Sequence, residues 1–253
     1  METILVSGRE TKVWTVEISR PDRRNAVNGP TAQALYEIFQ EFEQDKIACV
    51  AILYGRGGVF CAGADLTEMS NPLNLSVTQV APMGISRLRL KKPTIAAIDG
   101  YCVAGGLELA LWCDLRVATE SSIFGVFCRR WGVPLIDGGT IRLPRLIGQS
   151  RAMDMILTGR PVEAKEALSF GLINRLVSDG QSLIEARKLA DDLCKVPQDC
   201  MRSDRKSSLD QWSLPETVAL ANEFALGLPS LQKEGIYGAQ KFKGGLGRKG
   251  SML

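Results

Sequence analysis

Short apolar runs and amphipathic stretches alternate along the first part of the chain. Ile4 to Ser7 and Val13 to Ser19 are expected to form two strands joined by a polar turn, and the alternation in V-W-T-V-E-I-S supports the second. From Pro30 to about Asp45 apolar residues recur on one face of a helix. Cys49 to Tyr54 is again strand-like. This order predicts an α/β fold in which the helix packs on a sheet.

A strand-to-helix turn near the middle of the chain combines small residues with a lone charge. Thr94 to Ile98 fits a buried strand, and a loop ending in Gly105-Gly106 precedes a buried helix expected from Leu107 to Trp112. Glu108, in the first turn, is the only charge between Asp99 and Asp114. A carboxylate there either caps its helix or has a raised pKa and a chemical role.

A second turn of small residues follows the strand expected from Cys49 to Tyr54. It reads Ala62-Gly63-Ala64-Asp65 and also leads toward a helix, expected to begin at Leu66 to Met69. Two such turns can aim two backbone N–H groups at one point, which is how an oxyanion hole forms without side chains.

Further elements are expected along the rest of the chain. A helix is predicted from Val77 to Leu90 and a strand from Leu115 to Thr119, with a loose wall over a binding site or a solvated loop at Ser70 to Ser76. After Gly138 the pattern turns helical. The expected segments are Ser150–Leu157, Glu163–Phe170, Leu183–Cys194 and Glu216–Leu228, with a brief strand at Asn174–Val177.

Several ordered motifs together resemble the enoyl-CoA hydratase/isomerase (crotonase) superfamily over nearly the whole chain. They are F-C-A-G-A-D-L from Phe60, K-P-T-I-A-A-I-D-G-Y from Lys92, A-G-G-L-E-L-A from Ala104, and G-G-T-I-R-L-P-R-L-I-G from Gly138. The resemblance implies an α/β crotonase-like ββα spiral core over residues 1–195 and a C-terminal helical trimerisation region over residues 196–253. It implies a homotrimer or a dimer of trimers, although the helices after Gly148 could equally complete a monomer core.

The resemblance also assigns binding residues. The oxyanion hole would be formed by the N–H groups of Ala64 and Gly105. Contacts to the CoA moiety are expected from residues in both halves of the chain: Arg24, Ala62, Ala64, Asp65, Leu66, Thr67 and Lys241. The family often has Lys where Thr67 stands. Arg24 could also be an ordinary surface residue, and Lys241 part of a frayed tail.

The catalytic acids match the family only in part. Hydratases of this family pair two glutamates around one water, and Glu108 matches the first. Cys128 stands where the second is expected, and a thiol with a pKa of about 8.5 lacks the acidity of a glutamate. Asp137 falls where dienoyl-CoA isomerases of the family carry a functional aspartate. It is therefore either catalytic or the cap of the helix that begins at Gly138-Gly139.

Composition excludes several classes of chemistry. The 253 residues contain no histidine, so Ser-His-Asp and Cys-His nucleophiles and His-ligated metals are excluded. The net charge of +3 does not indicate nucleic-acid binding, and we expect neither a metal nor any cofactor apart from coenzyme A as part of the substrate. Seven cysteines without framework spacing predict free thiols in a reducing compartment, the cytoplasm. No signal peptide or membrane-spanning run is evident.

Three functions remain open from the sequence. The leading hypothesis is an acyl-CoA enzyme that hydrates a 2-enoyl-CoA. A double-bond isomerase that uses Glu108 and Asp137 is the first alternative. A CoA-binding protein that has lost its chemistry is the second, and it is motivated by Cys128.

Overall fold

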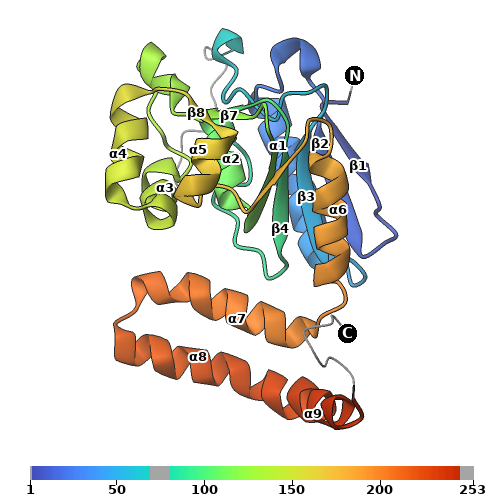
Figure 1. Ribbon diagram of the computed structural model, residues 1–253. Helices are drawn as coiled ribbons and strands as arrows, with labels where there is room; N and C mark the ends of the chain where they lie inside the picture. Colours follow the sequence, from blue (N-terminus) through green and yellow to red (C-terminus); the bar gives the residue numbers. More distant parts are fainter. Residues whose placement is uncertain (1, 69–79, 246–253) are drawn as a thin grey trace. The chain divides into compact units, whose positions relative to one another are not determined.

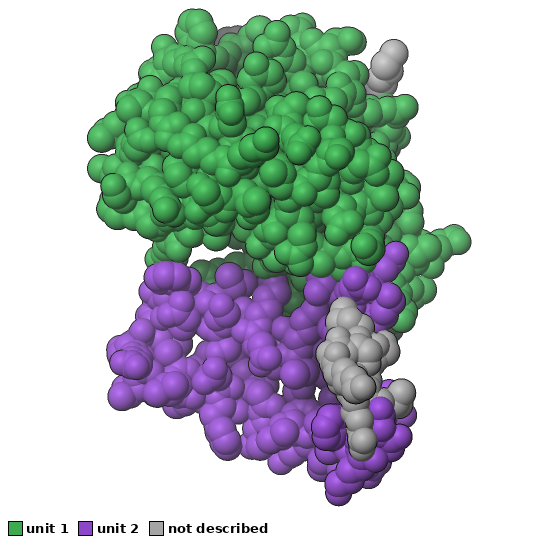
Figure 2. Space-filling view, in the orientation of Figure 1, with its two compact units in different colours: residues 1–190 green, residues 191–253 purple. Residues whose placement is uncertain are grey.

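The computed structural model describes residues 2–68 and 80–245, and the loop predicted at Ser70 to Ser76 lies outside them. The chain divides into two compact units, Met1–Ala190 and Asp191–Leu253, which Figure 2 colours separately. The trimerisation role expected for residues 196–253 stays a prediction.

A six-stranded sheet forms the frame of the first unit. Its order is β1-β2-β3-β4-β6-β9, in which β1 is antiparallel to β2 and every other neighbouring pair is parallel. The strands are β1 Ile4–Ser7, β2 Val13–Ile18, β3 Val50–Gly55, β4 Thr94–Ile98, β6 Leu115–Thr119 and β9 Arg175–Val177. All six strands were expected from the apolar runs, within one residue at each end. Residues Thr94–Ile98 are buried along their whole length, as expected of a central parallel strand.

Helix α1, Gly29–Gln44, packs on this sheet as predicted. Asn28 caps it by accepting a hydrogen bond from the Thr31 N–H at 3.1 Å. On its buried face the Phe42 ring meets the Trp14 ring of β2 edge to face, with centroids 5.7 Å apart. The helix therefore closes the hydrophobic core on one side of the sheet.

A small second sheet lies beside the first. It contains β5 Tyr101–Val103, β7 Ile123–Gly125 and β8 Val162–Glu163, in the order β5-β7-β8. The prediction of a loop for residues 101–103 was wrong, because three residues carry too little pattern to show a strand. Helix α2, Gly105–Trp112, follows β5 after one residue. It begins two residues earlier than predicted.

The predicted helix from Val77 to Leu90 is wrong over its described part, residues 80–90, which form bends and turns. Gly84 has φ +81°, and a Cβ there would lie 2.4 Å from the Ala32 carbonyl oxygen. The Met83 N–H donates to Asp137, 54 residues away, instead of to a helical carbonyl. Tertiary hydrogen bonds replace the local ones at this position.

The remaining helices of the first unit gather beyond α2, away from the large sheet, except for α6 (Figure 1). They are α3 Gly139–Ile147, α4 Gln149–Thr158, α5 Ala164–Phe170 and α6 Ser182–Leu193. Helices α4, α5 and α6 each lie within about one residue of the helical segment predicted there, and α3 begins at the Gly138-Gly139 pair where a helix start was expected. A short 3₁₀ turn, η3 Phe127–Trp131, connects β7 to this group.

The second unit is helical in its described part. It contains α7 Gln198–Asp210, α8 Glu216–Ser230, a π-helical turn at Leu231–Gly235 and α9 Ile236–Lys243. The sequence predicted α8 but not α7. Only Ser207 is buried on α7, so this helix has no apolar stripe to reveal it.

Among residues 2–68 and 80–245, no helix combines the length and the apolar character needed to span a bilayer.

Candidate functional site

The two turns of small residues meet at the heart of the first unit. Cys61 pairs with Cys102 in a short parallel bridge, in which the Cys61 N–H donates to Tyr101 at 3.0 Å and the Val103 N–H donates to Cys61 at 3.1 Å. Gly63 has φ +101°, and a Cβ there would lie 2.9 Å from the Gly105 nitrogen. Only glycine permits this approach of the two turns.

Both predicted oxyanion-hole residues line one cavity of about 440 Å³. Ala64 follows Gly63, and Gly105 is the first residue of α2. Within the described ranges, neither of their N–H groups donates a hydrogen bond to another residue. Two unpaired main-chain donors beside one cavity can receive an anionic oxygen.

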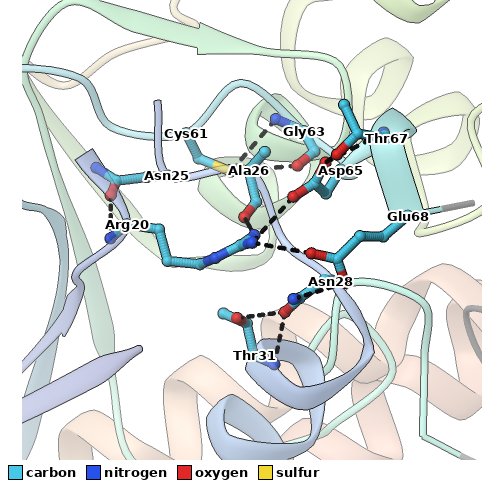
Figure 3. A network of polar contacts seen from close by, with 10 residues as sticks. All are labelled: Arg20, Asn25, Ala26, Asn28, Thr31, Cys61, Gly63, Asp65, Thr67 and Glu68. Atoms are coloured by element: carbon cyan, nitrogen blue, oxygen red, sulfur yellow. Dashed lines mark hydrogen bonds and ion pairs between the residues drawn. The ribbon is translucent and has the colours of Figure 1, made fainter. Parts of the chain in front are cut away.

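A polar network fixes the segment that carries Ala64 (Figure 3). The Arg20 guanidinium donates to Asp65 at 3.0 Å and to Glu68 at 3.4 Å, and Asn28 donates to Glu68 at 3.0 Å. The Thr67 hydroxyl donates to Asp65 at 2.7 Å. Burial acts to raise the pKa of Asp65, but the hydrogen bonds from Thr67 and Arg20 outweigh it and leave this pKa below its usual value. The network ties the turn after β3 to the loop before α1.

Glu108 lies in the first turn of α2 and lines the same cavity, with only 3% of its surface exposed. Its Oε1 accepts hydrogen bonds from the N–H groups of Asp137 at 2.9 Å and Gly139 at 2.8 Å. Burial raises its pKa to about 7, with a contribution from the neighbouring Asp137 charge, while the two N–H groups and Arg142 oppose the shift. This carboxyl group therefore exchanges protons near neutral pH.

Asp137 lines the cavity as well, and its carboxylate does not cap α3. The residue before that helix, Gly138, makes no side-chain cap, and the Asp137 Oδ1 accepts from the Met83 N–H at 3.0 Å and from the Ser86 hydroxyl. The carboxylate that receives the first N–H of α3 belongs to Glu108. Burial raises the pKa of Asp137, against hydrogen bonds from Ser86 and Met83.

Cys128, on η3, lines the cavity with Glu108 and is 8% exposed. Burial raises the pKa of its thiol, and the nearby Glu108 charge raises it further. The thiol is therefore protonated at neutral pH and is a weak acid.

Known proteins with similar sequences and structures show which family the chain belongs to. The model of the family described as enoyl-CoA hydratase/isomerase matches residues 8–238. The chain belongs to this family. It is 34% identical over 202 residues to the mevalonyl-coenzyme A hydratase sidH of Aspergillus fumigatus, which covers 78% of this chain and 75% of that protein. It is 33% identical over 220 residues to the enoyl-CoA hydratase EchA19 of Mycobacterium tuberculosis, with 84% and 83% covered. A crystal structure of an enoyl-CoA hydratase from M. tuberculosis H37Rv superposes with a TM-score of 0.90 at 32% identity, covering 96% of each chain.

For this member of the hydratase/isomerase family, the predicted CoA contacts fall into three groups. Arg24, Ala62 and Leu66 line the cavity together with Ala64. Asp65 and Thr67 are not among its lining residues and bond to each other and to Arg20. Lys241 lies on α9 in the second unit, where its ammonium is 4.6 Å from the centre of the Tyr237 ring.

Sequence reasoning missed three residues that hold the site together. They are Met83, Ser86 and Arg142. The first two lay inside a predicted helix, so nothing indicated their long-range bonds. Arg142 stands in the G-G-T-I-R-L-P-R motif that carried the family resemblance, but the motif alone gave it no role.

No cluster of three or more metal-ligating side chains occurs in the part of the chain that the structure describes.

Proposed function

We propose that this family member hydrates the double bond of a 2-enoyl-CoA thioester. The observation that carries the proposal is the pair of N–H groups on Ala64 and Gly105, which donate to no described residue and lie in one cavity with the buried Glu108. Relatives that match over most of this chain are named enoyl-CoA hydratases, which supports the same reaction.

The oxyanion hole would receive the charge that develops on the thioester oxygen. When water adds at the β-carbon, the electron pair of the double bond moves through the α-carbon to that oxygen and forms an enolate. Each N–H donor at about 2.7–3.1 Å from the oxygen is expected to lower the barrier by roughly 3 kcal/mol. The polar network around Asp65 holds one of these donors in place before the substrate binds.

Glu108 would move the proton. Its ionised carboxylate takes a proton from the water as the new C–O bond forms at the β-carbon, and the resulting acid returns that proton to the α-carbon. A pKa of about 7 suits both steps, because the group is ready to accept and to give a proton at neutral pH. Cys128 cannot replace the second glutamate, because its pKa is raised. A single carboxyl group therefore serves as base and then as acid.

A specific observation also favours double-bond isomerisation. Glu108 and Asp137 line the same cavity, and the hydrogen bonds that each carboxylate accepts from described residues end on one of its two oxygens. Within residues 2–68 and 80–245 the second oxygen of each carboxylate accepts no hydrogen bond, which leaves it open to a substrate. Two such groups could pass a proton from one carbon of an enolate to another.

Purified protein with crotonyl-CoA tests the first function through loss of the enoyl-thioester absorbance. We expect turnover by the wild type and a loss of about a hundredfold or more in Glu108→Gln, because acid–base catalysis contributes at least that much. Glu10→Gln, at an exposed position, is the matched control. Turnover of a 3-enoyl-CoA or dienoyl-CoA alone would favour the isomerase. Binding of CoA thioesters without turnover of any of them would favour a protein that has lost its chemistry.

The phosphate contacts, the assembly and the compartment of the protein are also proposals. The substrate is an acyl-CoA, with Arg24 and Lys241 as candidate phosphate contacts and no cofactor beyond the coenzyme A of the substrate. The protein would act as a homotrimer or a dimer of trimers in the cytoplasm. All seven cysteines are unpaired, which fits a reducing compartment.

A further inference from the structure

Arg142, the fourth residue of α3, joins two segments that border the cavity. Its Nη1 donates to the main-chain carbonyl of Asp137 at 3.0 Å, and its Nη2 donates to the carbonyl of Ser86 at 2.6 Å. These two carbonyls lie in the loop before α3 and in the turn region of residues 80–90. One partly buried guanidinium therefore connects two segments that are 51 residues apart at this point.

The charge of Arg142 has no direct ion-pair partner within residues 2–68 and 80–245. Burial lowers its pKa, and the nearby charges of Glu108 and Asp137 raise it, while Arg89 lowers it and Cys113 raises it. Both cavity carboxyl groups in turn have their pKa lowered by Arg142. A single cation, whose described side-chain hydrogen bonds go to carbonyls, thus acts on two carboxyl groups at once.

The segments that Arg142 joins also position the predicted oxyanion hole. The Asp137 N–H holds Glu108 at 2.9 Å, and the Asp137 carboxylate holds the Met83 N–H at 3.0 Å. The Met83 side chain packs over Gly105, since a Cβ on Gly105 would lie 2.6 Å from its sulfur. A change at Arg142 therefore reaches both the carboxyl group and one of the two N–H donors.

We propose that Arg142 is a positioning residue for the reaction. Its two hydrogen bonds hold the loop around Asp137 against the segment around Ser86, and its positive charge acts on the Glu108 carboxylate and favours the ionised form. This inference rests on the proposed function of Glu108 as the base. The other charged or titratable groups near Arg142 and Glu108 are Asp137 and Cys128 beside Glu108, Arg89 and Cys113 beside Arg142, and Arg87 beside Asp137.

The expected signature is a shift in the pH profile. Arg142→Gln removes a charge that lowers the pKa of Glu108, so this pKa rises. The ionised base then forms only at higher pH, and the acidic limb of kcat/KM for crotonyl-CoA moves upward by about one pH unit. At pH 7 the activity falls about tenfold through kcat, with a smaller change in KM, and part of it returns at higher pH. Arg142→Lys keeps the positive charge, so the acidic limb of its kcat/KM profile stays near that of the wild type.

Arg151→Gln, at an exposed position on α4, is the matched control and should leave the profile unchanged. Urea unfolding of each variant shows whether it is folded, and if Arg142→Gln does not fold, Arg142→Met and Arg142→Lys are compared instead. A glutamine variant that folds and keeps the wild-type limb would overturn the inference, as would a lysine variant whose limb shifts equally.

Failure of the proposed function is distinguishable from failure of this inference. Absence of turnover by the wild type rejects the hydratase, whatever the variants do. The Glu108 pKa is then followed by NMR on protein with ¹³C-labelled glutamate side chains. A higher titration midpoint in Arg142→Gln supports the role of Arg142, and an unchanged midpoint rejects it.

Discussion

At the scale of the residue, Glu108 combines burial with a reactive proton. A carboxyl group with 3% exposure would normally be neutral, yet two N–H groups and the charge of Arg142 hold its pKa near 7. The sequence identified Glu108 because it was the only charge in an apolar segment. The partners that set its pKa come from residues 29 to 34 positions further along the chain. No local pattern could identify them.

The raised pKa of Glu108 predicts how stability depends on pH. The folded group holds its proton up to about pH 7, whereas the unfolded group loses it near 4.5. Between these values the folded state binds more protons, so the free energy of unfolding falls as the pH rises. Relative to Glu108→Gln, we expect the wild type to lose about 3 kcal/mol over this window. Urea unfolding of both proteins at a series of pH values measures the difference. A difference that is constant with pH would contradict the prediction.

The role of Asp137 could not be determined from its position in the sequence. Its place before Gly138-Gly139 fitted a helix cap and a catalytic acid equally well. In the structure its carboxylate bonds to Met83 and Ser86, and Glu108 receives the N–H at the start of α3. Which of two nearby carboxylates receives a helix N–H depends on backbone orientation in three dimensions. Residue spacing does not contain that information.

At the scale of the element, α2 is held at both ends by contacts from distant segments. Its first turn meets Met83 and the start of α3, and at its other end Arg116 donates to the carbonyls of Ala110 and Cys113 at 3.3 and 2.7 Å. Arg116 also donates to Leu172 at 2.7 Å. The guanidinium, 3% exposed, therefore caps α2 and joins it to the segment before β9.

Replacement of Arg116 is expected to destabilise the first unit. Arg116→Met leaves several buried carbonyls without donors, which costs about 3 kcal/mol or more. The urea midpoint of unfolding measures the change. Arg175→Met, at an exposed strand position, is the control and should lie within about 0.5 kcal/mol of the wild type. Equal midpoints for the two variants would show that the cap contributes nothing.

The elements that the sequence predicted well are those with a strong apolar pattern. Thr94–Ile98 and Leu115–Thr119 are strands with the bounds expected. The helix predicted through residues 80–90 failed, because Pro82 removes a donor and Gly84 turns the chain toward α1. Helix α7 was missed for the opposite reason, since its surface is polar and only Ser207 is buried. The apolar sequence pattern identifies helices and strands that bury one face. It fails where hydrogen bonds to distant residues determine the backbone conformation.

At the scale of the whole molecule, the second unit exposes many large apolar side chains. Those at least 48% exposed in its described part are Leu209, Trp212, Val218, Leu220, Phe224, Leu231, Ile236, Tyr237 and Phe242. Apolar exposure of this extent is typical of a surface that associates with another chain. The trimer expected from the family resemblance stays a prediction, and this surface is where we expect the subunits to meet.

A change on α8 tests the assembly. The double variant Leu220→Glu/Phe224→Glu places charges on this apolar surface, so we expect its mass in solution to fall from that of a trimer or hexamer toward that of a monomer. Size-exclusion chromatography with light scattering measures the mass. Thr217→Glu, in the first turn of the same helix, should keep the assembly of the wild type. A wild type that is already monomeric, or a double variant of unchanged mass, would contradict the prediction.

Two helices begin at the same carboxyl group, since Gly105 opens α2 one turn before Glu108 and Gly139 opens α3 against its Oε1. Each helix start carries a partial positive charge of about half a unit. The main chain itself therefore makes this end of the cavity attractive to anions, independently of any side chain. A ligand that exists in neutral and anionic forms would be held more firmly as the anion, and binding would make it a stronger acid.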